Sequence, residues 1–191
     1  MAQANAAAAF NKDGFELFNN RTYVFLGDGC MQEGVASEAA SMAGHLGLKN
    51  LIAFYDDNHI TIDGDTNCAF TEDVGKRFES YNWNVLTVKN GDEDLSALWD
   101  AIVKAQQEKE RPTLVCVQTT IGFGSLNQGK ASVHGAPLKE DDIAQLKTRF
   151  GFNPEDKFVV PHDVRDAYKS YADRGAAKHA EWLKLLSLIH I

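Results

Sequence analysis

Two short apolar runs with a helical pattern between them constrain the fold of this chain more than any other feature. The runs, residues 22–26 and 51–55, are rich in β-branched and aromatic side chains and show no helical period. Such runs are typical of parallel strands buried on both faces, and the first is predicted to be a central strand. Between them, apolar residues recur at helical spacing over residues 35–46, and Gly44 and Gly47 mark the helix end.

A strand, a helix and a strand in this order form a right-handed crossover, and its two strands lie parallel in one sheet. Their carboxyl ends then face the same side, where open α/β sheets bind ligands. Gly27, Asp28 and Gly29 follow the first run, and Asn58 follows the second. Asp28 and Asn58 are therefore predicted to project into one crevice, and the helix after Gly29 can direct free backbone N–H groups at an anion.

Short oxygen-bearing side chains at two neighbouring strand ends suit a hard divalent cation. Mg²⁺ usually completes its octahedral shell with water and substrate phosphates, so a partial set of protein ligands predicts a phosphorylated partner. Gly27 and Gly29 would let the backbone approach phosphate oxygens closely. The glycine-aspartate-glycine triplet alone is equally typical of a tight turn, and this alternative stays open at this point.

Three separated blocks of sequence resemble the transketolase family of thiamine diphosphate enzymes. Residues 27–34 read GDGCMQEG, residues 56–64 read DDNHITIDG, and residues 132–138 read SVHGAPL. The first block and Asn58 have the spacing of the thiamine diphosphate signature. The resemblance extends from about Ala2 to about Tyr168, covers part of the family's first domain, and weakens beyond that point.

The resemblance implies a fold and a cofactor site. The fold is α/β, a doubly wound and mostly parallel sheet with helices on both faces, and the cofactors are thiamine diphosphate and Mg²⁺, for which Ca²⁺ or Mn²⁺ can substitute. The family's metal ligands match the side chains of Asp28 and Asn58 and the backbone carbonyl of Ile60. The backbone N–H of Gly29 matches a contact to the diphosphate, although a plain turn glycine is the simpler interpretation.

Further positions acquire roles only through the resemblance. Ile62 and Ile121 match residues that pack against the thiazolium ring, although each also reads as ordinary core. His134 matches an active-site histidine beside the cofactor, where it could bind a diphosphate oxygen and transfer protons. Glu33 and Glu38 match dimer-interface glutamates, although carboxylates are also favourable in the first turns of a helix.

The activity implied by the resemblance is transfer of a two-carbon ketol unit from a ketose phosphate to an aldose phosphate, as in the pentose phosphate pathway. Sugar phosphates are then the substrates, and the full-length protein is a homodimer. The chain carries no match to the family's glutamate that activates the aminopyrimidine ring, so it is expected to be inactive alone. Alternatives are a dihydroxyacetone synthase and a noncatalytic cofactor-binding fragment; a deoxyxylulose phosphate synthase and a plain nucleotide-binding domain fit less well.

Composition excludes some other classes of protein. The net charge of −8 argues against a nucleic-acid-binding surface. The three cysteines are widely spaced and are interpreted as reduced thiols. No membrane span or secretory signal is recognisable, so a cytoplasmic protein is expected, with a plastid left open because the N-terminus looks truncated.

The rest of the chain predicts more of the same architecture. In the helix expected over residues 95–109, Trp99 is predicted to lie in the core. Residues 1–168 are expected to form the cofactor-binding domain, truncated at its N-terminal side, and residues 169–191 a helical tail. The apolar end of that tail, Leu185 to Ile191, is assigned no function and need not be native. Other elements are predicted as helices over residues 2–10, 72–81 and 140–149 and strands over residues 85–88 and 113–119.

Overall fold

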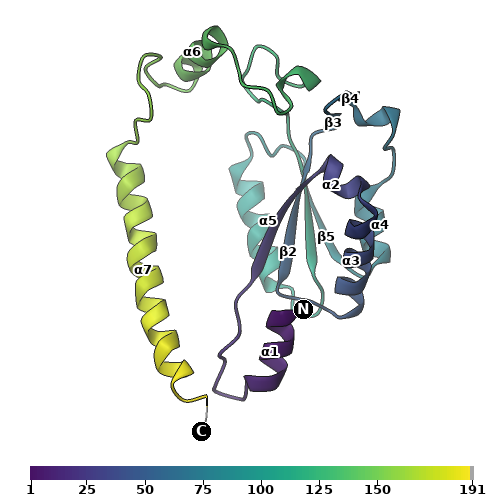
Figure 1. Cartoon of the computed structure of the whole chain (residues 1–191), viewed down its shortest axis with the longest axis vertical. Coiled ribbons are helices and arrows are strands. Elements are labelled where there is room, and N and C mark those ends of the chain that lie inside the picture. The colour runs from purple at the N-terminus through teal and green to yellow at the C-terminus, as the bar shows by residue number, and fades with distance from the viewer. Residues whose placement is uncertain (190–191) are drawn as a thin grey trace. The chain divides into compact units, whose positions relative to one another are not determined.

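The computed structural model describes residues 1–189, and its largest feature is a four-stranded parallel sheet (Figure 1). Every pairing within this sheet is parallel, as the crossover pattern predicted. All of its strands therefore end at one edge, where the candidate site lies. The strands are β1 (Thr22–Gly27), β2 (Leu51–Asp57), β5 (Asn84–Val88) and β6 (Thr113–Gln118).

The order of the strands explains why helices cover both faces of the sheet. The order is β1-β2-β6-β5, so the chain moves outward from β1 to β5 and then turns back to β6. Because parallel crossovers are right-handed, the helices before and after this reversal lie on opposite faces. This confirms the predicted doubly wound α/β fold. One face is covered by α3 (Gly34–His45) and α4 (Val74–Ser80), and the other by α5 (Leu95–Gln107).

The two cores alternate along the strands, as the period of two requires. On β2, Ala53 and Tyr55 belong to the cluster under α3 and α4, whereas Ile52 and Phe54 belong to the cluster under α5. The face toward which Tyr55 points is also the face of the candidate site. The remaining elements of the segment Arg21–Pro154 are α2 (Asp28–Gln32), β3 (Ile60–Thr61), β4 (Gly64–Asp65), the 3₁₀ turns η1 (Thr66–Cys68) and η2 (Ala131–Val133), and α6 (Glu140–Arg149).

The C-terminal end of α3 is fixed by its glycines. Gly47 has a φ of +57°, and the N–H groups of Leu48 and Gly47 donate to the carbonyls of Ala43 and Gly44 at 3.1 Å each. These two bonds form a Schellman motif, which satisfies carbonyls that would otherwise lack a partner. Gly44 has a different role: a Cβ there would lie 1.7 Å from the backbone oxygen of Tyr81. The helix approaches the end of α4 this closely only because position 44 has no side chain.

The prediction that β1 is a buried central strand is wrong for the residues that the structure describes. β1 is an edge strand, and the side chain of Phe25 is 81% exposed. Phe25 stacks on Phe54 of β2, whereas α5 packs on β5 and β6 and reaches β1 through the hydrogen bond from Gln106 to the hydroxyl of Tyr23. An apolar run identifies a strand, whereas its burial depends on which elements cover it.

The prediction that Trp99 is core is also wrong, since Trp99 is 65% exposed. The buried face of α5 is centred on Ala101 and Ala105, with Leu98 and Ile102 beside them. Small side chains let the helix lie close to the sheet, and this sets its rotation. Trp99 then lies beyond the edge of the buried face. Apolar periodicity predicted the helix correctly but not which part of its apolar stripe faces the sheet.

Outside the sheet, a second compact unit combines Met1–Asn20 with the segment from Glu155 onward. It contains α1 (Ala2–Phe10), as the alanine-rich start predicted, and the long helix α7 (His162–Leu186). Within this unit the indole N–H of Trp182 donates to the carbonyl of Leu17 at 3.0 Å. The predicted domain boundary after residue 168 falls inside α7 and stays a prediction, and of the apolar end, residues 190 and 191 lie outside the described residues.

No helix among the described residues is both long enough and apolar enough to cross a bilayer.

Replacing Gly44 with alanine should destabilise the fold, because the new methyl group would overlap the Tyr81 carbonyl and force the backbone apart. We expect a loss of about 1–3 kcal/mol in the free energy of unfolding, measured by urea denaturation. Gly34→Ala is the matched control, since α3 also contains Gly34 and a Cβ there meets nothing within 4 Å. The control should be neutral or stabilising. Equal losses in both variants would contradict this account of Gly44.

Candidate functional site

Asp28 is the most unusual side chain at the carboxyl edge of the sheet. It follows β1 directly and begins α2, yet it is only 4% exposed. Its Oδ1 accepts a hydrogen bond of 2.5 Å from the hydroxyl of Tyr55, whereas its buried Oδ2 has no hydrogen-bond partner among the described residues. A buried carboxylate oxygen without a partner is costly. The position suits a cation, which binds negatively charged oxygen atoms.

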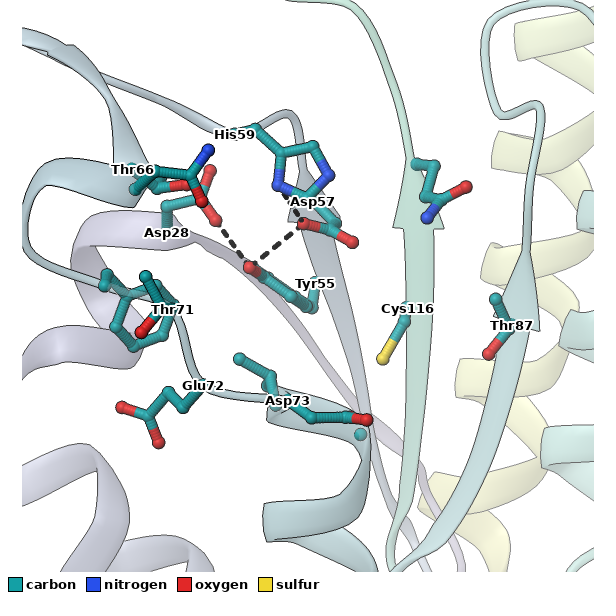
Figure 2. A pocket seen from close by; sticks show the side chains of 15 residues that line it. Asp28, Tyr55, Asp57, His59, Thr66, Thr71, Glu72, Asp73, Thr87 and Cys116 are labelled. Atoms are coloured by element: carbon teal, nitrogen blue, oxygen red, sulfur yellow. Dashed lines mark hydrogen bonds and ion pairs between the residues drawn. The ribbon is translucent and has the colours of Figure 1, made fainter.

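Asp28 lines a pocket of about 340 Å³ at the carboxyl ends of the strands (Figure 2). Tyr55, Cys116 and Thr87 lie side by side in the register of β2, β6 and β5, and all three line this pocket. Figure 2 shows Tyr55 between the carboxylates of Asp28 and Asp57. The pocket therefore has a floor made of sheet residues and a wall made of carboxylates.

Among the described residues, four carboxylates line this pocket: Glu72 and Asp73 are paired with Arg77 and Lys76, whereas Asp28 and Asp57 both contact the hydroxyl of Tyr55. Burial raises the pKa of Asp28, the hydrogen bond from Tyr55 opposes this, and the nearby Asp57 adds to the rise. Burial and the same carboxylates raise the pKa of Tyr55, which keeps its proton. Burial also raises the pKa of the Cys116 thiol to about 12, so it stays protonated. His59 lies 3.3 Å from Asp57, measured from Nδ1 to Oδ1. A cation would relieve the repulsion between the carboxylates.

Asn58 lies at the strand end where the sequence predicted it, between two pocket residues. The register pairs Gly27 with Asp56, so Asp28 and Asn58 both come just after a paired strand end. The amide of Asn58 is engaged locally: its Nδ2 donates to Asp56 at 2.9 Å, and its Oδ1 accepts from the N–H of Ile60 at 3.0 Å. Asn58 and Ile60 are thus neighbours of the pocket, and their role as metal ligands stays a prediction.

Gly29 lies in the first turn of α2, at an open surface. A Cβ at Gly27 or Gly29 would meet nothing within 4 Å, and neither glycine has a positive φ. No described residue therefore requires glycine at these positions, and the space above them is available to a ligand. Buried Asp28 Oδ2, open space over both glycines and an oxygen-rich wall fit the cation and diphosphate that the sequence predicted.

Glu33 is not within a helix turn as predicted, because the helix is interrupted there. Glu33 has φ −73° and ψ 130° and separates α2 from α3. An extended residue at this point ends one helix and acts as the N-cap of the next. Glu38 is on α3 as expected and is exposed. It borders an open depression, and the residues that line this depression are Ser37, Glu38, Ser41, Met42, His45 and Tyr81.

The other predicted site residues lie on loops and do not line the Asp28 pocket. Ile62 is 70% exposed between β3 and β4, so the core interpretation of this side chain is wrong. Ile121 is half-buried in the loop after β6, and its carbonyl accepts a bond of 2.8 Å from Gly129. His134 is exposed and follows η2. Their roles toward a cofactor stay predictions.

Sequence reasoning missed two buried polar groups of the segment Arg21–Pro154. Tyr55 was interpreted only as part of a buried strand, although a hydroxyl at the end of a strand beside two aspartates is a signal for a polar role. Asp142 was missed as well: it is 3% exposed and accepts bonds from Ser125, Leu126 and Gln145 at 2.5, 3.0 and 2.8 Å. These bonds lower the pKa of Asp142 and tie the loop after β6 to α6.

The known proteins that this chain resembles are transketolases. Residues 1–189 match the family model described as transketolase, thiamine diphosphate binding domain. The match continues past Tyr168, so the prediction that the resemblance extends only to about this residue is wrong. Transketolase 1 of Saccharomyces cerevisiae is 59% identical over 188 residues, which are 98% of this chain and 28% of that protein. Transketolase of Kluyveromyces lactis is 60% identical over 187 residues, covering 97% of this chain and 27% of that protein.

Solved structures agree. Transketolase of Pichia stipitis in complex with sedoheptulose-7-phosphate superposes with a TM-score of 0.95 at 53% identity, covering 98% of this chain and 28% of that one. Transketolase from Leishmania mexicana gives a TM-score of 0.95 at 44% identity with the same coverage. The chain thus spans somewhat more than a quarter of the relatives it matches. It belongs to the transketolase family, and it corresponds to the family's thiamine diphosphate-binding domain.

Proposed function

We propose that this chain supplies the magnesium- and diphosphate-binding part of a transketolase, which moves a two-carbon ketol unit from a ketose phosphate to an aldose phosphate. The observation that carries the proposal is the buried, unpartnered Oδ2 of Asp28 at the edge where β1 and β2 end. Family membership alone would not distinguish a working cofactor site from a degenerate one. A desolvated carboxylate with a free oxygen at this position favours the working site.

Different residues would bind the metal ion and the diphosphate. The Asp28 carboxylate, the Asn58 amide oxygen and the Ile60 carbonyl would hold Mg²⁺, which also takes oxygen from the diphosphate. For Asn58 this requires its Oδ1 to share or exchange its bond with the N–H of Ile60. Gly29 would donate its N–H to the diphosphate across the open space above it.

Ile62, Ile121 and His134 would lie near the reactive part of the cofactor. Thiamine diphosphate, when bound, supplies an electron sink for cleavage of a carbon–carbon bond. The two isoleucines would exclude water from the ring, which gives a reason for the exposed position of Ile62 in this chain. The exposed His134 would bind a diphosphate oxygen and carry a proton. Solved relatives are described as complexes with xylulose-5-phosphate and sedoheptulose-7-phosphate, which supports ketose phosphates as substrates here.

The dimer proposal concerns the exposed face of α3. Val35 and Met42 of this helix and Leu46 at its C-cap are 68%, 52% and 48% exposed, and Glu33 and Glu38 flank them. Exposed apolar groups of this kind are typical of an interface. A second copy of the complete enzyme would cover them. A monomeric complete enzyme that binds thiamine diphosphate, observed by analytical ultracentrifugation, would contradict this proposal.

Asp28→Ala should remove magnesium-dependent cofactor binding. We expect thiamine diphosphate to bind the unaltered chain only with Mg²⁺ present, and the variant to bind at least about 100-fold more weakly, because the metal loses its charged ligand. Isothermal titration calorimetry measures both. Asp100→Ala on the exposed side of α5 is the charge-matched control and should bind like the unaltered chain. Binding that ignores Mg²⁺, or that survives Asp28→Ala, would refute the metal site.

Activity can be tested in a chimera in which this chain replaces the matching 188 residues of Transketolase 1 of Saccharomyces cerevisiae. The chimera should transfer ketol units from xylulose 5-phosphate, and His134→Ala should lower kcat by at least about 100-fold, the usual range for a lost acid–base group. Thermal stability should not change, since His134 is exposed.

The control for this experiment is His162→Ala, which removes an exposed histidine at the start of α7. It should leave kcat unchanged. A folded chimera that binds thiamine diphosphate but transfers no ketol unit would contradict the proposed activity. Equal losses for both histidine variants would contradict the specific role of His134.

A further inference from the structure

The two oxygens of the Asp28 carboxylate have different surroundings. Oδ1 accepts the bond of 2.5 Å from the Tyr55 hydroxyl, and Oδ2 is buried without a partner among residues 1–189. A carboxylate that is free to rotate could exchange these two atoms. The hydrogen bond therefore determines which oxygen is left for a ligand (Figure 2).

Tyr55 has only one proton to donate, and two carboxylates compete for it. Its oxygen lies 2.5 Å from Asp28 Oδ1 and 3.2 Å from Asp57 Oδ1. A phenol donates a single hydrogen bond, and the shorter contact marks its acceptor. Asp57 has another neighbour in His59, at 3.3 Å. The proton of Tyr55 is thus directed to Asp28, and Asp57 has an alternative partner.

Tyr55 itself is held rigidly. It is 3% exposed and belongs to β2, which is paired with β1 on one side and with β6 on the other. Its ring packs in the core cluster under α3 and α4. A side chain fixed by strand pairing and by core packing cannot follow the carboxylate if the carboxylate turns. Tyr55 is therefore a hydrogen-bond donor in a fixed position, and it holds Asp28 through this bond.

We propose that Tyr55 is a positioning residue for the metal site, and that its hydroxyl locks the Asp28 carboxylate so that Oδ2 is presented to Mg²⁺. The inference rests on the proposed function, since it assumes that Asp28 is a metal ligand. Groups that orient metal ligands through hydrogen bonds commonly contribute about 10- to 100-fold in metal affinity. Tyr55 contacts no metal or substrate in this proposal. Its effect acts through Asp28.

The proposal predicts a change in metal selectivity as well as in affinity. Mg²⁺ demands nearly ideal octahedral geometry, whereas Ca²⁺ accepts flexible and irregular shells. A carboxylate that can rotate should therefore harm Mg²⁺ binding more than Ca²⁺ binding. A loss of folded protein would lower the apparent binding of both ions alike. The ratio of the two affinities thus separates positioning from a merely structural role.

The experiment titrates Mg²⁺ and, separately, Ca²⁺ into the full 191-residue chain mixed with thiamine diphosphate, using isothermal titration calorimetry. Tyr55→Phe removes the hydroxyl and keeps the ring in the core. Tyr23→Phe is the matched control: it removes a tyrosine hydroxyl of β1 that accepts a bond of 2.7 Å from Gln106, away from the pocket. Unfolding midpoints without metal are measured for each variant.

In Tyr55→Phe the dissociation constant for Mg²⁺ should rise by about 10-fold or more, the rise for Ca²⁺ should be several-fold smaller, and Tyr23→Phe should change neither. Unchanged Mg²⁺ affinity in Tyr55→Phe, or equal losses for both ions, would overturn the positioning role while leaving the metal site intact. Failure of the unaltered chain to bind Mg²⁺ would overturn the proposed metal site, and this inference with it.

Discussion

The parallel register between β1 and β2 is the constraint on which the rest of the site depends. Leu26 lies opposite Tyr55 and Gly27 opposite Asp56, so β1 ends where Tyr55 can reach the next residue of the chain, Asp28. Because side chains alternate along a strand, a slip of one residue would turn Tyr55 to the opposite face of the sheet. The carboxylate would then lose its donor. The pairing of β1 with β2 thus fixes the position of Asp28 Oδ1, which lies just beyond the end of β1.

Burial of Asp28 disfavours its charged form, and the hydrogen bond from Tyr55 does not fully offset this effect. Its pKa is raised above the ordinary 3.8, mainly by burial. The folded state therefore binds this proton more tightly than the unfolded state. With respect to this group, the cation-free fold is most stable at pH below 3.8. It loses this stability as the pH rises through the raised pKa of Asp28. A bound divalent cation would favour the charged carboxylate and offset this loss. Metal binding and folding are therefore expected to be coupled at neutral pH.

The sequence allowed the strands, most helices and the edge that carries Asp28 and Asn58 to be predicted, because period and strand order are local properties with few compact solutions. The errors share a cause. Whether Phe25 is covered and how far α5 is rotated around Trp99 depend on packing between distant elements. Tyr55 was missed because an aromatic residue in a strand has a sufficient explanation as core, and its hydroxyl matters only once the register places it beside an acid. Family resemblance supplied the predicted roles of the loop residues, which geometry alone does not assign.

The central claim is that Asp28 Oδ2 is a metal ligand kept free by the fold. Crystals of the chain grown with thiamine diphosphate and Mn²⁺, an ion with similar preference for oxygen ligands, would test it through anomalous scattering. If Asp28 Oδ2 is a ligand, a manganese peak should lie about 2 Å from it, with the Tyr55 hydroxyl still donating to Oδ1. A manganese ion bound elsewhere, or an Oδ2 that is hydrogen-bonded to protein while the ion is absent from this edge, would contradict it.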